Sequence, residues 1–170
     1  MEMNPENSHS DIKPRPRLLT VLCILSFISL GLSFVSVVGS LFYGPTSSTE
    51  IVQQRADLAV STEKIRSTGM GEVADAFEQV QRMNEALNRH FYEASTVSLL
   101  LVVLGFYGVL SMWKGRKIGF HIYIIYNLAT IANLYLFVSP TDIPSYAVIW
   151  GVLISAIFIM LYARNLKWFS

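Results

Sequence analysis

The chain has 170 residues, of which 52% are hydrophobic and 15% are charged, and its formal net charge is +1. A soluble domain of this length usually carries about 25% charged residues. The charged residues are also absent from four long segments, so the composition excludes an ordinary soluble domain. No nucleic-acid partner is expected. The single cysteine, Cys23, excludes an intramolecular disulfide and a thiolate metal cluster.

The four segments without Asp, Glu, Lys or Arg predict four transmembrane helices, because roughly 20 apolar residues are needed to cross the hydrocarbon core. They are residues 18–42, 94–113, 118–138 and 146–163. The expected fold is all-α, a four-transmembrane-helix bundle with an extramembrane antiparallel helical hairpin between the first and second spans. The fourth span is the shortest, and Tyr162 near its end and the flanking Arg164 are expected to extend its reach by snorkelling.

Residues 1–17 contain three prolines and little apolar material, so they predict a disordered cytoplasmic tail. Three basic residues in this tail precede the first span, as they would in a cleaved signal peptide. The apolar run of residues 18–42 is much longer than the core of a signal peptide, which favours a retained helix.

Five serines recur every three or four residues along the first span and therefore share one stripe of the helix. They are Ser26, Ser29, Ser33, Ser36 and Ser40. Small residues let helix backbones approach closely in lipid, where hydrophobic attraction between helices is weak. The stripe predicts a helix-packing seam, with a hydroxyl-lined pathway as the alternative. We expect Gly105 and Gly108 on the second span, and Ala147, Gly151 and Ser155 on the fourth, to belong to the same seam.

Residues 43–93 predict two helices outside the lipid. A Gly-Pro pair ends the first span, Ser47 and Glu50 have the spacing of a capping box, and Gly69 and Gly71 separate the two helices. The apolar residues of the second helix fall on one face: Val73, Phe77, Val80, Leu87 and Phe91.

Neither Gly nor Pro separates this second outer helix from the second span. One continuous helix is therefore expected from about Glu72 to Met112, so that the outer hairpin extends the first pair of spans beyond the lipid. The hairpin is interpreted either as a self-packing extension or as a docking surface for a partner or a second copy of the chain. Two helices alone bury little apolar surface, which favours some further contact.

The third span is the most polar of the four. Its polar side chains fall within about a 120° arc at the 100° per residue of an α-helix. They are Tyr123, Tyr126, Asn127, Thr130 and Asn133. An amide in hydrocarbon needs a partner, so this arc is expected to face the interior of the bundle. It predicts a polar pocket, and hydrogen bonds that only fix helix packing are the alternative.

Basic residues predict the orientation, because Lys and Arg collect on the side that is not translocated. Residues 1–17, the turn of residues 114–117 and the tail of residues 164–170 together hold eight of them, whereas the loop of residues 139–145 holds none. The segment of residues 43–93 has five basic and eight acidic residues. Both termini are therefore predicted to be cytoplasmic, and the hairpin periplasmic or extracellular.

The spans carry no carboxylate, and His121 is their only readily ionised group. A proton relay or a metal site would need acidic or further histidine partners at ligand spacing, so His121 is interpreted as an interfacial residue. No phosphate-binding loop, nucleophile elbow or zinc-protease motif occurs in the sequence. No catalytic residue, metal or cofactor is expected.

The stretch of residues 112–127, MWKGRKIGFHIYIIYN, places a tight basic turn between two spans. It resembles stretches of small uncharacterised bacterial four-pass membrane proteins. The resemblance implies a bacterial cytoplasmic (inner) membrane and no particular activity.

These patterns favour a non-enzymatic integral membrane protein, an accessory or assembly subunit that acts through helix packing and its outer hairpin. Its expected partner, besides the lipid bilayer, is a second copy of the chain or another membrane protein. The alternative is a small transporter or channel lined by the polar face of the third span. A membrane enzyme is disfavoured, because the spans lack a nucleophile and a base to activate it.

Overall fold

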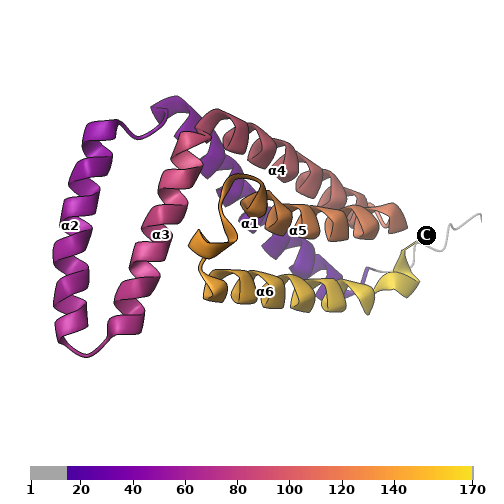
Figure 1. Ribbon diagram of the computed structural model, residues 1–170. Coiled ribbons are helices and arrows are strands. Elements are labelled where there is room, and N and C mark those ends of the chain that lie inside the picture. The colour runs from indigo at the N-terminus through magenta and orange to yellow at the C-terminus, as the bar shows by residue number, and fades with distance from the viewer. Residues whose placement is uncertain (1–14, 170) are drawn as a thin grey trace, which may run out of the picture.

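The computed structural model describes residues 15–169, and its regular elements are all helices. In chain order they are α1 (Arg17–Tyr43), α2 (Ser48–Ser67), α3 (Gly71–Arg89), α4 (Phe91–Trp113), α5 (Lys117–Phe137), the short 3-10 helix η1 (Pro140–Asp142), α6 (Ser145–Ala163) and the 3-10 helix η2 (Leu166–Trp168) (Figure 1). The predicted all-α class is confirmed. Most of the predicted N-terminal tail, residues 1–14, lies outside the described residues.

Four of these helices, α1, α4, α5 and α6, are long and apolar enough to cross a membrane, which confirms the four predicted spans to that extent. They contain 27, 23, 21 and 19 residues respectively. At about 1.5 Å of rise per residue, even a helix of the length of α6 extends for ~28 Å. This length is close to the ~30 Å thickness of a hydrocarbon core.

The tightest packing between spans joins α4 to α5. A Cβ atom added at Gly119 would lie 2.5 Å from the backbone nitrogen of Met112 and 2.6 Å from the carbonyl oxygen of Gly108. Small residues on both helices therefore bring the two backbones into direct contact. Gly115, with a φ of +79°, lies in the turn between them and adopts a conformation that suits glycine.

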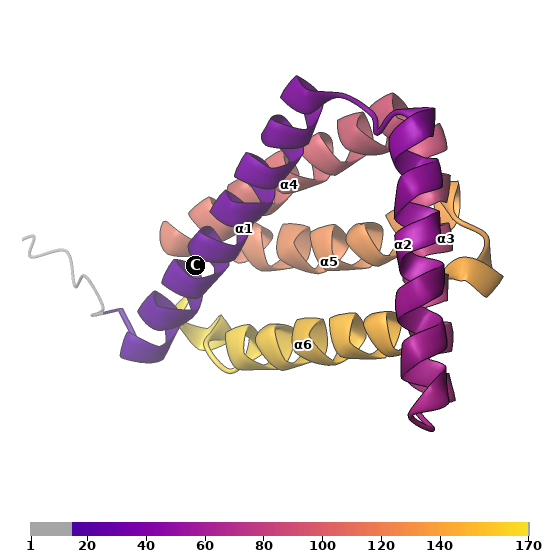
Figure 2. The ribbon, with the colours of Figure 1, turned by 90° about the vertical axis from the view of Figure 1, so that its left-hand side faces the viewer.

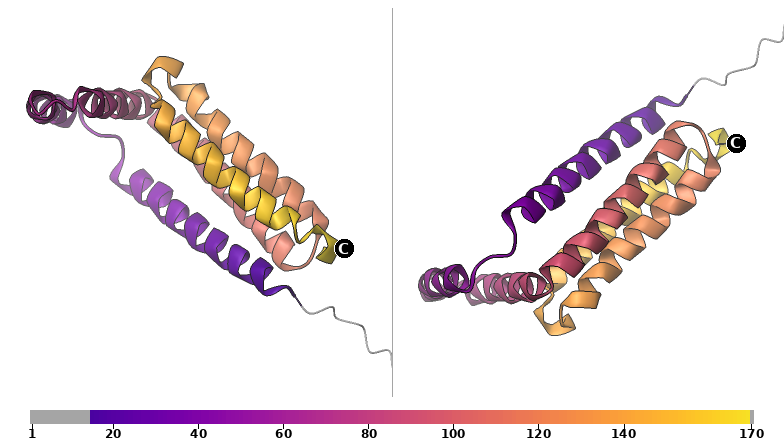
Figure 3. Two further views of the ribbon diagram at one scale, coloured as in Figure 1. Left: turned by 90° about the horizontal axis from the view of Figure 1, so that it is seen from below. Right: turned by 90° about the horizontal axis from the view of Figure 1, so that it is seen from above.

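α1 runs along one side of the layer that α4, α5 and α6 form, and it crosses that layer at an angle (Figures 2 and 3). α6 is the least covered span. Of the residues in its apolar 18-residue stretch, 6% are buried inside the protein, against 33% for the corresponding stretch of α4. The C-terminal end of α6 is an exception, because Tyr162 is completely buried and its hydroxyl lies 3.0 Å from the hydroxyl of Ser26. The prediction that Tyr162 snorkels to the interface is therefore wrong.

The prediction of one continuous helix from Glu72 to Met112 is also wrong. α3 ends at Arg89 and α4 begins at Phe91, and between them His90 leaves the helical conformation, with φ −111° and ψ 34°. The imidazole of His90 packs beside the ring of Phe137, with 5.9 Å between the ring centroids. The break thus coincides with a contact to the end of α5, and neither Gly nor Pro occurs at this position.

Because of this break, α3 lies across the ends of α5 and α6 and does not continue the line of α4 (Figures 1 and 2). Ala86 of α3 is buried against Val138 and Ile143 of the α5–α6 connection. The Arg82 guanidinium donates a hydrogen bond of 3.0 Å to the carboxylate of Asp142 in the same connection. The α3 helix is thus held against the ends of the spans by both apolar and ionic contacts.

α2 lies beside α3 and runs antiparallel to it (Figure 1). The capping box predicted at its N-terminus is present, with Ser47 and Glu50 bonding each other's backbone N–H groups. Ion pairs join the two helices: Arg55 binds Glu85, and Arg66 binds Asp75 at 2.7 Å. The hydrogen bond from Arg55 lowers the pKa of the Glu85 carboxyl below its ordinary value.

The α4–α5 turn and both described chain ends lie at the opposite end of the spans from α3 (Figure 1). The Arg15 guanidinium stacks over the indole of Trp113, 4.1 Å from the ring centroid, and lies 5.6 Å from the ring of Trp168. It also donates a hydrogen bond to the carbonyl oxygen of Trp113. The described parts of the basic segments used for the orientation prediction therefore share one end of the molecule.

Candidate functional site

A cleft of about 320 Å³ lies between α1, α5 and α6, in the middle of the spans. Its walls carry Ser26, Ser29 and Leu30 of α1, Tyr123, Tyr126, Asn127, Thr130, Ile131 and Leu134 of α5, and Ala147, Val148, Gly151, Ile154, Ser155 and Phe158 of α6. Ser29, Thr130 and Ile154 remain exposed, so the cleft is open along one side. The cleft contains most of the predicted polar pocket together with part of the predicted packing seam.

The polar face of α5 supplies the floor of this cleft. Tyr123 and Asn127 are buried, with 6% and 8% of their surface exposed. The Asn127 amide donates a hydrogen bond of 2.7 Å to the carbonyl oxygen of Tyr123, and the Thr130 hydroxyl donates one of 2.8 Å to the carbonyl oxygen of Tyr126. Both side chains thus use their own helix to satisfy their donors, as polar side chains in apolar surroundings must.

Asn133, the fifth member of the predicted polar pocket, does not line the cleft. Its amide nitrogen lies 3.3 Å from the hydroxyl of Ser98 on α4, and its carbonyl oxygen is buried without a hydrogen-bond partner in the described part of the chain. The predicted arc is therefore divided, with four residues facing the cleft and Asn133 facing α4.

The predicted serine stripe of α1 is divided in the same way. Ser26 is buried against Tyr162, and Ser29 lines the cleft. Ser33 and Ser40 donate to carbonyl oxygens of their own helix, those of Ser29 and Val37. Ser36 is exposed. In the described part of the chain, the outer half of the stripe thus makes no side-chain hydrogen bond to another span, because α1 crosses α5 and α6 at an angle (Figure 2).

The predicted glycines of the seam also differ from one another. A Cβ atom at Gly105 would lie 2.7 Å from the side chain of Leu30, and one at Gly108 would lie 3.2 Å from the backbone nitrogen of Tyr123, so both glycines are in close helix–helix contact. A Cβ atom at Gly151 would meet nothing within 4 Å. Gly151 is therefore a small residue on a cleft wall that no part of the described chain fills.

Two residues that shape the site were not recognised as such in the sequence. Gly119 makes the closest approach between α4 and α5, and Tyr162 supplies the partner of Ser26. The position of Gly119, four residues after the turn glycine Gly115, is a usable signal for close packing of the two helices. No comparable signal marks Tyr162, since an aromatic residue near a span end is typical of an interface.

Packed clusters bound the cleft at both ends. Towards the α4–α5 turn lie the completely buried side chains of Leu19, Cys23 and Tyr162. Towards α3 lie Val138 and Ile143 with Val148 packed against them. The cleft therefore opens sideways and lies between two packed clusters of side chains, one towards the α4–α5 turn and one towards α3.

The cleft carries hydroxyl and amide groups and no charged side chain. Within residues 15–169, no cluster of three or more His, Cys, Asp or Glu side chains is placed to hold a metal ion. His121 lies on an exposed face of α5, with its ring nitrogen 3.2 Å from the carbonyl oxygen of Lys117, and does not line the cleft. The groups that the cleft presents are suited to helix packing and hydrogen bonding.

No protein-family model, curated protein or solved structure matches this chain in the comparisons made.

Proposed function

We propose that this protein is a non-enzymatic integral membrane protein of a bacterial cytoplasmic membrane, an accessory or assembly subunit. It acts by receiving a transmembrane helix, from a second copy or from another membrane protein, in the cleft between α1, α5 and α6. The observation that carries this proposal is the unfilled small-residue wall formed by Ala147, Gly151 and Ser155 of α6.

The glycines of the spans differ in whether a neighbouring helix lies against them. A glycine inside a helix costs about 1 kcal/mol relative to alanine, and close backbone approach is the usual compensation in membrane helices. Gly105, Gly108 and Gly119 have that compensation within the chain, because a neighbouring span lies against each of them. Gly151 lacks it, as do Gly31 and Gly39 of α1, but of these three only Gly151 lies on a wall of the cleft, in the middle of a small-residue stripe with a spacing of four. A helix supplied from outside the chain would provide the missing contact.

The open side of the cleft supports a helix as the occupant. The walls on α1 and α6 are apolar apart from serine hydroxyls, and Ser29 and Ser155 are available along them. Serine on a helix surface allows close approach and can hydrogen-bond across a helix pair. A transmembrane helix that enters the cleft sideways from the bilayer would approach these walls closely and hydrogen-bond their serine hydroxyls.

The test is a pair of matched substitutions on opposite faces of α6. Gly151→Leu fills the cleft wall, whereas Ala156→Leu introduces the same leucine side chain on the exposed opposite face. Native mass spectrometry of protein released from nanodiscs should show a dimer or a stoichiometric complex for the wild type and Ala156→Leu. Gly151→Leu should reduce that species to the monomer. A wild-type protein that is strictly monomeric and carries no membrane-protein partner would contradict the proposal.

We also propose that the end bearing the basic segments is cytoplasmic and that the α2–α3 hairpin is periplasmic or extracellular. The support is the distribution of Lys and Arg, which follows the positive-inside rule. In a Cys23→Ala background, a membrane-impermeant thiol reagent added to intact cells should label Glu63→Cys on α2. It should label Lys114→Cys only after permeabilisation, and the reverse pattern would invert the orientation.

A small transporter or channel lined by α5 is the second candidate. It is favoured by the gathering of Tyr123, Tyr126, Asn127 and Thr130 on one cleft wall, and opposed by the packed clusters at both ends. Asn127→Leu separates the two functions. A transport site should lose flux in proteoliposomes with the fold retained, whereas a packing residue should lose stability.

A further inference from the structure

The α3 helix carries one apolar face that meets two different environments along its length. At the 100° per residue of an α-helix, Val73, Phe77 and Val80 fall within about 60° of one another, and Met83 and Leu87 continue the same side. In the C-terminal half, Met83 and Leu87 pack around Ala86 against the α5–α6 connection. In the N-terminal half the face has no such cover, because 44% of Val73 and 49% of Phe77 are exposed.

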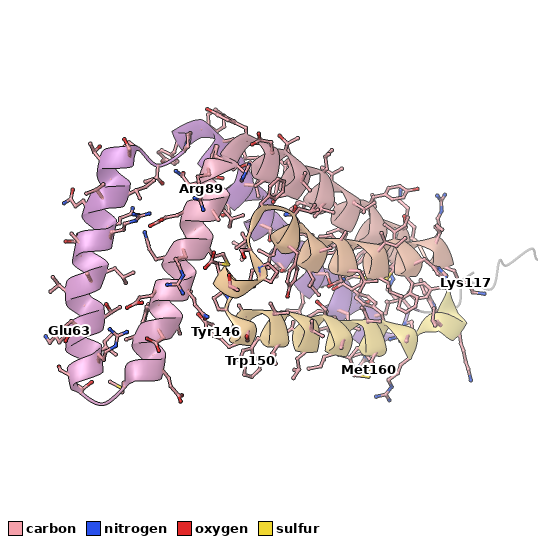
Figure 4. All side chains as sticks on the ribbon, viewed as in Figure 1. Glu63, Arg89, Lys117, Tyr146, Trp150 and Met160 are labelled. Atoms are coloured by element: carbon pink, nitrogen blue, oxygen red, sulfur yellow. The ribbon has the colours of Figure 1, made fainter. Side chains whose placement is uncertain are left out.

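The uncovered half lies beside the first turn of α6. A groove of about 460 Å³ runs between them, lined by Glu72, Val73, Ala76, Phe77 and Val80 of α3 and by Tyr146 of α6. Figure 4 shows Tyr146 and Trp150 at this end of α6, next to α3. Both aromatic side chains are substantially exposed, at 47% and 61%. Tyrosine and tryptophan are enriched at the level of lipid head groups, where an apolar ring and a polar group are both satisfied.

We infer that the N-terminal half of α3 is an interfacial helix that rests in the outer surface of the bilayer, with Val73, Phe77 and Val80 inserted among the lipids beside Tyr146. The lipid is the occupant because this face is continuous with the lipid-facing surface of α6, where Ile149 and Trp150 are each 61% exposed. An amphipathic helix with its apolar face at this depth is a stable arrangement in membranes.

The charges of the hairpin agree with this placement. Asp75 and Glu78 lie off the apolar face and bind Arg66 of α2, so they remain on the water side. The α3 helix itself has four acidic and two basic residues, which gives it no attraction for anionic lipids. Its insertion therefore depends on apolar burial and should not increase with the content of anionic lipid.

Site-directed spin labelling of the full chain in proteoliposomes tests this inference. In a Cys23→Ala background, a nitroxide is placed at Phe77→Cys, at Met160→Cys on the exposed face of α6, and at Glu63→Cys on the far side of α2 (Figure 4). Collision rates are measured with oxygen, which concentrates in lipid, and with a water-soluble nickel chelate. Val73→Cys provides a second site on the same face if Phe77→Cys does not fold.

The Phe77 label should resemble the Met160 label, with a rate of collision with the nickel chelate several-fold lower than at Glu63. Lipids that carry a paramagnetic metal chelate on the head group should enhance the spin relaxation of the Phe77 label. Raising the share of anionic lipid should leave these values unchanged. A Phe77 label as accessible to nickel as Glu63 would overturn the inference. A Phe77 label shielded from both the nickel chelate and the paramagnetic lipids would also overturn the inference, because that pattern means that protein covers the face. The test does not depend on occupancy of the α1–α5–α6 cleft, and a water-exposed Met160 label would instead refute the membrane assignment.

Discussion

Substitution of Gly119 by alanine should destabilise the protein, although alanine is the better helix former. The added Cβ atom would lie 2.5 Å from the Met112 nitrogen, 2.6 Å from the Gly108 oxygen and 2.8 Å from the Ser111 Cβ. Ordinary van der Waals contacts begin near 3.4 Å, so α4 and α5 would have to separate by nearly 1 Å. The obstructing atoms belong mainly to the backbone, and rotation of a side chain cannot relieve the contact.

The size of the effect follows from two opposing contributions. Overpacking a close contact costs about 1–3 kcal/mol, and replacing glycine by alanine inside a helix returns about 1 kcal/mol. The net loss in the free energy of unfolding should be up to about 2 kcal/mol, and each 1.4 kcal/mol is about tenfold in the equilibrium constant. Gly31→Ala is the matched control, because a Cβ there meets nothing within 4 Å. It should be neutral or slightly stabilising.

The lone cysteine provides the assay. Cys23 is completely buried in the core formed by α1, α4, α5 and α6, so a thiol-reactive fluorophore can reach it only when that core opens. Heating in mild detergent should release fluorescence at a lower temperature in Gly119→Ala than in the wild type, and at an equal or higher temperature in Gly31→Ala. If Gly119→Ala opened at or above the wild-type temperature, the close approach of α4 and α5 would not exist as described.

Two further predictions concern single contacts. Ser26→Ala and Tyr162→Phe should show a coupling of about 0.6 kcal/mol, and at most about 1.7, in a double-mutant cycle of unfolding, whereas additive effects would mean the hydroxyls do not bond. The pKa of Glu85 is lowered by Arg55, so its contribution to α2–α3 pairing should be complete above the ordinary carboxyl pKa of about 4.3 and should fall as the pH drops through the lowered value. Amide hydrogen exchange in α2 should accelerate over that acidic range, and a Glu85→Gln variant with an unchanged pH response would refute this origin.

The parts of the structure that depend on local chemistry could be predicted from the sequence. Runs without charge predict spans because lipid excludes charge regardless of tertiary contacts, and the Ser47–Glu50 capping box forms within one turn of helix. The break at His90 could not be predicted in this way. The break contains no helix-breaking residue, and the contact that accompanies it involves Phe137, a residue 47 positions further along the chain.

The candidate site was predicted in composition but not in arrangement. A polar arc of about 120° on α5 is wide enough to reach two neighbouring helices, which is why Asn133 faces α4 while Asn127 faces the cleft. A straight serine stripe likewise cannot follow a partner that crosses at an angle (Figure 2), so Ser26 bonds Tyr162 of α6 whereas Ser36 is exposed. Crossing angles depend on all the side chains at the contact, and a single helix does not specify them.

The lipid environment decides which exposed residues are informative. In water, the many exposed leucines and isoleucines of α1 and α6 would demand a partner, but in a bilayer they are already solvated by lipid chains. A small or polar side chain left uncovered in the same environment is different, because lipid neither fills a glycine groove well nor hydrogen-bonds a hydroxyl. Gly151 and Ser29, on opposite walls of one open cleft, are such residues. They therefore point to a missing helix more strongly than the larger apolar surface around them.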